Sequence, residues 1–297
     1  IRWPATTNTF YLASLLWICP SMNRHQLRNL LVNTKLRYVA GPVYDSALLL
    51  QLKIADFYDI FKTKTVDNSD LELTAIIKTF ERPKQLRRLV KSLKKHYPAV
   101  PIIIADDSKI PTEIDGTTLV RLPFDSGVSA GRAAALEQVK TRYTWNFDDD
   151  LILTSGTNAE LAVSGLNRNQ QLDLIGGEWL NLPQLLWCKV NENETFDTDE
   201  RQILPSGTII DDNFEVRDKV SSFFIARTEK LRAVGYRPEL KRLDHAYFFT
   251  RARGKIVSAH CKKMYALHAQ APFDQNYHSF RDDYEADLQN LSERYIK

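Results

Sequence analysis

Short apolar runs alternate with helical segments between residues 71 and 147, and this alternation constrains the fold more than any other feature. Four runs have the length and composition of strands: 71–78, 101–105, 119–122 and 143–147. Apolar residues at helical spacing connect them over 83–96 and 129–140. This order predicts an α/β fold, in which a mostly parallel sheet is flanked by helices and binds its ligand at the carboxyl ends of the strands.

Composition narrows the class of protein. The 297 residues are 43% hydrophobic and 26% charged, so the chain can bury a core and is neither disordered nor fibrous. The formal net charge of +3 is too small to indicate a nucleic acid partner. The three cysteines, Cys19, Cys188 and Cys261, are too scattered for a zinc knuckle or a dense disulfide framework.

The segment Thr63–Asp70 is polar and rich in residues that interrupt helices and strands, so we place a domain boundary there. Residues 1–70 are then expected to form a helical N-terminal extension. Residues 71–270 form the main domain, and residues 271–297 form a charged tail that is helical from Phe280.

Two features of the N-terminal extension predict helices. Gly41-Pro42 is expected to interrupt the segment, and Ala47–Phe61 reads as an amphipathic helix after that break. The apolar run Phe10–Cys19 is too short for a membrane-spanning helix, which needs about 20 residues. It predicts a buried helix, with a remnant of a signal or anchor segment as the alternative.

Polar clusters follow three of the four predicted strands, at the point where each strand ends. The first strand runs into Lys78–Pro83, the second into Asp106–Ser108, and the fourth into Asp148–Asp150. Because the carboxyl ends of parallel strands share one edge of a sheet, we expect these clusters to converge on one crevice.

The triplet Asp148-Asp149-Asp150 lies between two apolar runs. Adjacent carboxylates repel one another unless a cation or hydrogen-bond donors neutralise them. Their oxygens suit Mg²⁺ or Mn²⁺, which keep coordination positions open for substrate phosphates. A solvated acidic turn, or a set of caps for a following helix, is the alternative.

Two neighbouring segments could bind anions. Asp125–Arg132 is a glycine-containing loop that runs into a helix, whose N-terminus favours an anion, although an ordinary tight turn has the same composition. The predicted helix 83–96 is strongly basic, which indicates a solvated face or contact with an acidic membrane surface.

The later part of the chain predicts further sheet structure. Gly176-Gly177 follows an apolar run and indicates a strand with a bulge, and Phe214–Arg227 reads as a hairpin or strand pair. His260 and His268 would share one face of an uninterrupted strand, because their spacing is even.

The segments KTFERPKQLRRLVKSL, PIIIADDS, DSGVSAGR, WNFDDD, VSSFFIARTEKLRAVGY, LDHAYFF and ALHA follow one another in this order. Together they resemble the nucleotide-sugar glycosyltransferases of the GT-A fold over residues 72 to 270. Within that group, the sequence is similar to ganglioside-type β-1,4-N-acetylgalactosaminyltransferases and to family-2-like bacterial glycosyltransferases. The resemblance implies a Rossmann-like sheet, a UDP-sugar donor, Mn²⁺ or Mg²⁺ as cofactor, and displacement with inversion.

The resemblance also implies roles for individual residues. Those expected to bind the nucleotide sugar are Thr79, Arg82, Asp106, Asp107, Arg132, Asp148, Asp149, Gly177 and Trp179. Asp150, the last acid of a DXD-type motif, and His268 are implied as metal ligands. Asp244 is the candidate base that takes the proton of the acceptor hydroxyl, with a helix cap as its alternative role and Asp211-Asp212 as a rival acidic pair.

The chain departs from the family pattern at two positions. Ala133 stands where the family usually has Asn, and the acid stands at Asp244 rather than three residues later, where this chain has Tyr247. The first departure removes one contact to the donor, and the second leaves the acceptor and the linkage open.

We therefore expect an inverting, metal-dependent glycosyltransferase that moves a hexosamine or hexose, with GalNAc favoured, from a UDP-sugar to a glycan or glycolipid hydroxyl. The alternatives are a non-catalytic carbohydrate-binding or scaffold domain with a degenerate site, and a sugar-nucleotidyltransferase. The expected location is membrane-associated, through a peripheral contact: the Golgi lumen in a eukaryote, or the cytoplasmic face of the inner membrane in a bacterium.

Overall fold

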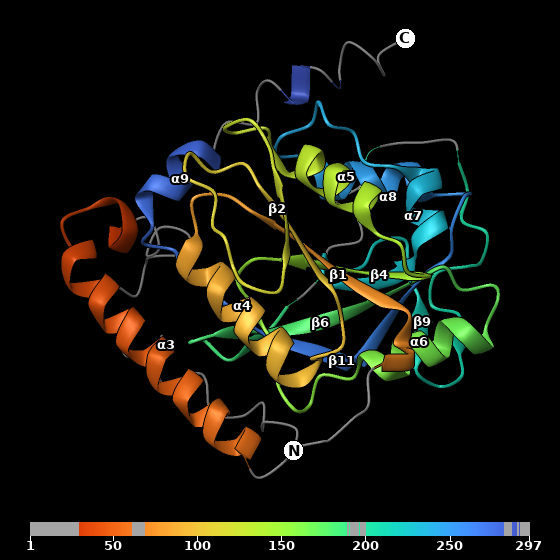
Figure 1. The fold of residues 1–297 in the computed structure, drawn as a ribbon, viewed down its shortest axis with the longest axis horizontal. Coiled ribbons are helices and arrows are strands. Elements are labelled where there is room, and N and C mark those ends of the chain that lie inside the picture. The colour runs from red at the N-terminus through yellow and green to blue at the C-terminus, as the bar shows by residue number, and fades with distance from the viewer. Residues whose placement is uncertain are drawn as a thin grey trace, which may run out of the picture.

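The computed structural model describes residues 30–60, 69–188, 190, 196, 200–281, 287–289 and 291. Their central feature is a single mixed sheet with helices on both faces (Figure 1). The apolar run Phe10–Cys19 lies outside the described residues. Among the helices that are described, none combines the length and apolarity that crossing a membrane requires.

Four strands form the parallel half of the sheet, and they are the four that the sequence predicts. Their order across the sheet is β3 (Thr118–Arg121), β2 (Ile102–Asp106), β1 (Leu73–Thr79) and β4 (Tyr143–Asp148). Strand β1 is buried along its whole length, as expected for a central strand with helices on both faces.

Helices α4 (Pro83–His96) and α5 (Val128–Gln138) cover opposite faces of this half. Alternate residues of β1 point to opposite faces: Ile77 packs in the cluster that contains Leu89 of α4, and Ile76 packs in the cluster that contains Leu136 of α5. Helix α4 begins and ends as predicted, because Pro83 suits a first helical turn and apolar residues recur at helical spacing behind it.

The second half of the sheet combines both strand directions. Next to β4 lie β10 (Phe224–Arg227), β6 (Leu174–Leu182), β11 (Ser258–Ala269), β9 (Phe214–Val216) and β8 (Ile209–Ile210). Strand β10 is antiparallel to both β4 and β6, whereas β6 and β11 are parallel. Two short strands join from the side, with β5 (Leu151–Ile152) pairing with β11 and β7 (Leu186–Trp187) pairing with β6.

The expectation of a hairpin over Phe214–Arg227 is wrong. Strand β9 pairs with β8 and β11, and β10 pairs with β4 and β6, so the two strands of this segment lie apart in the sheet. The residues between them cross the sheet near the carboxyl end of β4, where Asn146 Nδ2 donates to the backbone oxygen of Ser222 at 2.6 Å.

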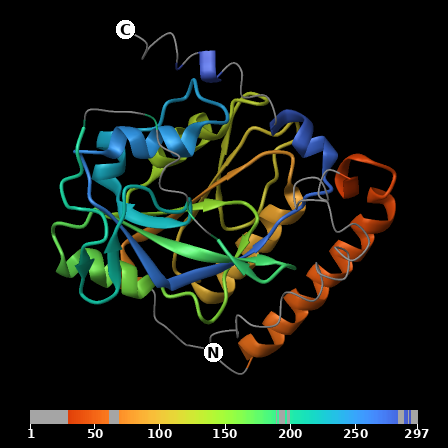
Figure 2. The same cartoon turned by 180° about the vertical axis from the view of Figure 1, so that it is seen from behind.

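The other helices complete the two layers. Helices α7 (Thr228–Val234) and α8 (Asp244–Ala252) lie with α5 on one face, and α6 (Ala159–Arg168) shares the other face with α4. Helix α9 (Gln275–Arg281) follows β11, and a short 3-10 turn, η1 (Ser69–Leu71), precedes β1. Helix α9 begins at Gln275, earlier than the predicted start at Phe280. Figure 2 shows the same layers from behind.

Helix α3 (Arg37–Ile60) runs along one edge of the domain, and Pro42 lies inside it, so Gly41-Pro42 does not interrupt the helix as predicted. Packing outweighs the helix-breaking tendency of this pair, because Leu48 is buried against Leu180 and Leu267 at the ends of β6 and β11. Asp59 joins α3 to the core: its carboxylate contacts His96 Nε2 at 3.0 Å and accepts from the Ser155 amide at 2.9 Å.

The bulge expected at Gly176-Gly177 lies in the partner strand instead, and the glycines of β6 accommodate this irregularity of β11. The register between the two strands shifts between His260 and Tyr265, and a Cβ at Gly177 would overlap the backbone oxygen of Met264. Because the shift interrupts the alternation of side chains, the even spacing of His260 and His268 does not place them at one site.

Candidate active site

The three polar clusters at the strand ends meet at one edge of the sheet, as the alternation of elements predicts. They line a cavity of about 600 Å³ at the carboxyl ends of β1, β2 and β4. Lys78 forms an ion pair with Asp107, which joins the β1 and β2 ends. Thr79 Oγ1 donates to Asp149 Oδ2 at 2.7 Å, which joins the β1 and β4 ends.

The acidic triplet is neutralised from within the protein. Arg82 donates from one guanidinium nitrogen to Asp149 and from the other to Asp150, each at 2.8 Å, and the ring of Tyr277 stacks on it at 4.4 Å. Burial raises the pKa of Asp149 to about 6, and Arg82 opposes this rise only in part. Burial acts on Asp150 in the same direction, but His268 and Arg82 together hold its pKa well below the usual range.

Asp150 and His268 form a pair that suits a divalent cation. His268 Nε2 lies 3.2 Å from Asp150 Oδ1, so both groups face the same point of the cavity. Asn181 Nδ2 donates to the Leu186 oxygen at 3.0 Å, which leaves Asn181 Oδ1 facing His268 Nδ1 at 2.8 Å. With its proton on Nδ1, His268 would present the lone pair of Nε2 to a metal.

Within the part of the chain that the structure describes, no three His, Cys, Asp or Glu side chains gather as a metal cluster. A cation held by Asp150 and His268 would thus have two protein ligands. Its other positions would be open to phosphate oxygens and water, an arrangement typical of Mg²⁺ in nucleotide enzymes. The residues present fit such an ion.

A second network connects β4, α5 and α8. Arg132, which is buried, donates to Asp148 Oδ1 at 2.7 Å and also pairs with Asp244. Ser129 donates to Asp244 as well, and Ser222 Oγ donates to Asp148 Oδ2 at 2.5 Å. The N-cap position of α8 is Leu243 and Asp244 is the first helical residue, so the alternative interpretation of Asp244 as the N-cap is wrong.

Most of the residues predicted to bind the nucleotide sugar line the cavity, and two do not. Asp107 lines it and accepts from the Gly127 amide at 2.8 Å. Asp106 is fully buried behind it, where its carboxylate accepts from the amides of Ser108 and Thr112 at 2.8 Å each. Gly177 also lies outside the cavity, because its backbone packs in the sheet against Phe223.

Trp179 lines the cavity, and its ring centroid lies 5.2 Å from that of His268. The rival acids lie elsewhere: Asp211 pairs with Arg168 at 3.3 Å, and neither it nor Asp212 lines the cavity. His260 also lies outside it, 3.9 Å from Glu178.

Sequence reasoning missed several residues that line the cavity. They come from β1, from the crossing segment before β10, from the turn before α8 and from α9: Lys78, Lys219, Ser222, Arg242, Tyr277, His278 and Phe280. Lys78 already belongs to the predicted polar cluster Lys78–Pro83, and only its role in binding was missed. The residues of α9 carried no signal, because a charged tail has no pattern that shows where it docks.

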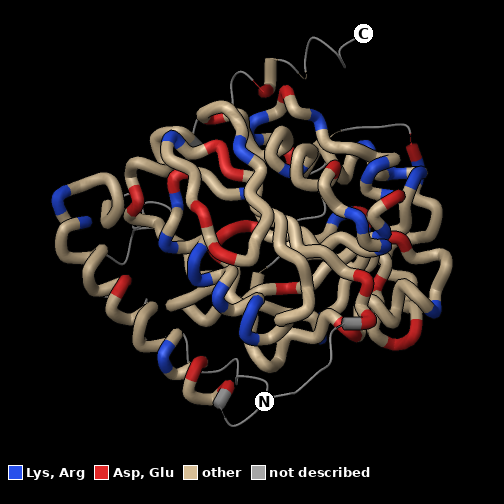
Figure 3. The backbone as a smooth tube through the Cα atoms, viewed as in Figure 1, with Lys and Arg blue, Asp and Glu red and all other residues tan. Residues whose placement is uncertain are grey.

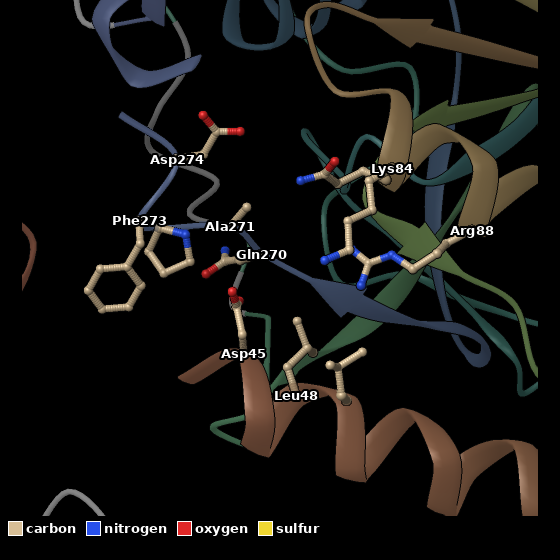
Figure 4. Close-up of a pocket in the computed structure, with 11 residues that line it drawn as sticks. Asp45, Leu48, Lys84, Arg88, Gln270, Ala271, Phe273 and Asp274 are labelled. Carbon is tan, nitrogen blue, oxygen red and sulfur yellow. The ribbon is translucent and has the colours of Figure 1, made fainter. Parts of the chain in front are cut away.

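A smaller cavity of about 230 Å³ lies between α3 and α4 (Figure 4). Figure 4 shows Lys84 and Arg88 of α4 on one side of it and Asp45 of α3 on another. It shares Gln270–Pro272 with the main cavity, and burial lowers the pKa of Arg88. Lys and Arg recur along α4, as the blue segments of its trace in Figure 3 show, and most of them are exposed.

The sheet order and the site at its carboxyl edge define a GT-A fold, and comparison with known proteins agrees. A solved structure of S. aureus TarS 1–349 in complex with UDP-GlcNAc has a similar fold, with a TM-score of 0.50 at 19% sequence identity. The match covers 67% of this chain and 58% of that one. The fold class predicted from the sequence is therefore confirmed.

Sequence comparisons identify the family of proteins that the chain resembles. Residues 74–176 match glycosyl transferase family 2. The chain is 34% identical over 218 residues to human β-1,4 N-acetylgalactosaminyltransferase 1 and 34% identical over 204 residues to mouse β-1,4 N-acetylgalactosaminyltransferase 2. These matches cover 66% and 64% of this chain but only 39% and 38% of the relatives. The resemblance to glycosyltransferases predicted from the sequence is confirmed.

Proposed function

We propose that the protein is an inverting, metal-dependent glycosyltransferase that moves a hexosamine or hexose from a UDP-sugar to a hydroxyl of a glycan or glycolipid. The observation that carries this proposal is the meeting of Asp150 and His268, 3.2 Å apart, in a cavity at the carboxyl ends of the parallel strands. The names of the relatives favour GalNAc as the sugar, and the TarS complex with UDP-GlcNAc supports a UDP-linked hexosamine.

The parallel half of the sheet would bind the nucleotide. Asp107, held by Lys78 and the Gly127 amide, offers a fixed carboxylate to the uridine, and Phe80 and Phe280 supply aromatic surface beside it. Asp150 and His268 would hold Mn²⁺ or Mg²⁺, which as a Lewis acid stabilises the negative charge of the leaving diphosphate. Thr79 donates to Asp149, and Arg82 pairs with both Asp149 and Asp150, which holds the two carboxylates in place.

Asp244 would be the general base, across the cavity from the diphosphate. The acceptor oxygen attacks the anomeric carbon as the bond from that carbon to the UDP oxygen breaks, and the hydroxyl proton passes to the Asp244 carboxylate. Arg132 and Ser129 orient this carboxylate, and Arg132 also fixes Asp148 beside the donor. A single displacement of this kind inverts the configuration at the anomeric carbon.

Membrane association is part of the proposal. The exposed basic residues of α4 would face anionic lipid and keep the enzyme close to a glycolipid acceptor: Lys84, Arg87, Lys91, Lys94 and Lys95. Whether the compartment is the Golgi lumen or the cytoplasmic face of a bacterial membrane follows from the source organism.

A donor-hydrolysis screen tests the proposal. The protein is incubated with UDP-GalNAc, UDP-GlcNAc, UDP-Gal and UDP-Glc, with Mn²⁺ or with a chelator, and release of UDP is measured. We expect one donor to turn over only with the metal, and Asp150→Asn to abolish that turnover. Asp211→Asn, which changes an exposed acid outside the cavity, serves as the matched control and should keep full activity.

Asp244→Asn separates binding from chemistry. This variant should bind UDP like the wild type and lose transfer to the acceptor, because it keeps the shape of the side chain but cannot take a proton. Turnover of every donor in the presence of chelator would contradict the metal assignment, and normal transfer by Asp244→Asn would contradict the base assignment.

A further inference from the structure

We propose that Asp287, in the C-terminal segment, is a positioning residue for Asp244. The inference rests on the proposed role of Asp244 as the base and adds a group that no sequence motif indicated. Asp287 does not line the cavity, so it would act through the backbone and not by touching a substrate.

The Asp287 carboxylate binds the turn that leads directly into Asp244. One oxygen accepts from the Lys241 amide at 3.0 Å, and the other accepts from the amides of Arg242 and Leu243 at 2.6 and 2.8 Å. Asp287 is only 2% exposed. Hydrogen bonds from backbone amides to a buried carboxylate are charge-assisted, and a negative charge just before α8 is also favoured by the helix dipole.

The same turn packs against the start of α5, the helix that holds the other side of Asp244. The Val128 amide donates to the Lys241 oxygen at 3.0 Å, and a Cβ at Gly127 would lie 2.5 Å from Lys241 Cα, so only glycine allows this approach. Helix α5 carries Ser129 and Arg132, the two partners of the Asp244 carboxylate. Asp287 therefore fixes the junction from which both Asp244 and its partners extend.

Arg242 adds a second connection between this turn and the C-terminal segment. Its Nε donates to the Phe280 oxygen at 2.8 Å, and its other end donates to Asp125 Oδ1 at 2.7 Å. Phe280 and Tyr277 of α9 line the cavity. The C-terminal segment thus contributes both a wall of the cavity and the group that orders the turn before Asp244.

Removal of the Asp287 carboxylate would leave three backbone amides without their acceptor and release the turn. Displacement of a catalytic group by about 1 Å costs on the order of 100-fold in rate. We therefore expect Asp287→Ala to lower kcat for transfer by roughly 10- to 100-fold. UDP affinity should fall less than kcat, because residues 241–243 lead directly into Asp244 but reach Asp107 only through Gly127, whose amide donates to the Asp107 carboxylate.

The experiment measures kcat and KM for transfer, UDP affinity and thermal stability for the full chain with Asp287→Ala, Asp287→Asn and Leu288→Ala. Leu288 is an exposed neighbour, and its variant should match the wild type. Asp287→Asn keeps one acceptor oxygen and should restore part of kcat. If Asp287→Ala does not fold, Asp287→Asn carries the test, because its kcat should still fall below that of the wild type and by more than its UDP affinity does.

The double variant Asp287→Ala/Asp244→Asn should transfer no more slowly than Asp244→Asn alone, because Asp287 acts through Asp244. Unchanged kcat in both Asp287 variants would overturn the inference, and so would losses that simply add in the double variant. Failure of the proposed function is recognised separately: the wild type would then turn over no UDP-sugar, or Asp244→Asn would transfer normally.

Discussion

Substitution of Gly131 by alanine should destabilise the protein, although the same change normally stabilises a helix. Gly131 lies in α5, where alanine in place of glycine ordinarily contributes about 1 kcal/mol. Here the added methyl group would overlap Cδ of Lys78 and lie within 2.6 Å of its Cε. Lys78 cannot move aside freely, because it is only 8% exposed and pairs with Asp107, which is 1% exposed.

The magnitude follows from these contacts. Separation of a buried ion pair costs about 3–5 kcal/mol, and the gain in helix propensity offsets about 1 kcal/mol, so we expect a net loss of roughly 2–4 kcal/mol. For a domain of this size, that loss lowers Tm by roughly 5–15 °C. UDP affinity should fall as well, since Lys78 and Asp107 both line the cavity.

Gly41→Ala is the matched control. Gly41 also lies inside a helix, α3, but the nearest atom to its added methyl would be Phe273 Cγ at 3.5 Å, an ordinary contact. This variant should be about 0.5–1 kcal/mol more stable than the wild type. Chemical denaturation of both variants measures the two free energies. A Gly131→Ala protein at least as stable as the wild type would refute the account of Lys78 as a buried, fixed group.

Two further predictions concern charged groups. Burial opposes ionisation of Asp59, but hydrogen bonds from His96 and Ser155 hold its pKa well below the usual range. The stability it contributes is therefore complete above the unfolded pKa of about 3.9 and declines as pH falls below it. Asp59→Asn should lower the free energy of unfolding by about 1–3 kcal/mol at neutral pH and by less at pH 3. Guanidinium unfolding at both pH values measures this loss, and an equal loss at both would contradict the prediction. Arg82→Lys loses the two guanidinium contacts to Asp149 and Asp150, so UDP-sugar turnover in the hydrolysis assay should fall about tenfold or more. Turnover equal to that of the wild type would show that these two contacts are dispensable.

The sequence predicts the parallel half of the fold well because the signals there are local. Strands β1, β2 and β4 are short apolar runs, each followed by its own polar cluster, so the positions of Thr79, Asp107 and Asp150 at one edge follow from strand order alone. Helix α4 is predicted to its exact bounds for the same reason: a proline opens it and one apolar face defines it.

The rest of the structure depends on partners far away in the sequence. Nothing in Phe214–Arg227 indicates that its two strands pair with different neighbours. The bulge in β11 separates His260 from His268 although their spacing is even, and Pro42 stays helical because Leu48 and its neighbours are buried against two other strands. The role of Asp287 could not be predicted for the same reason, because the three hydrogen bonds that it accepts depend on the position of the residues before α8.

The residues that line the cavity come from two different parts of the sequence. The acids and Arg82 at the sheet edge come from one contiguous stretch, residues 78–150, whereas the rest of the cavity lining is gathered from later segments: Trp179, the 219–222 crossing, α8 and α9. Substitutions and insertions in the later segments can reshape that lining while the sheet edge beneath it keeps its geometry. Under the proposed function, laboratory libraries aimed at a new acceptor therefore belong in these later segments.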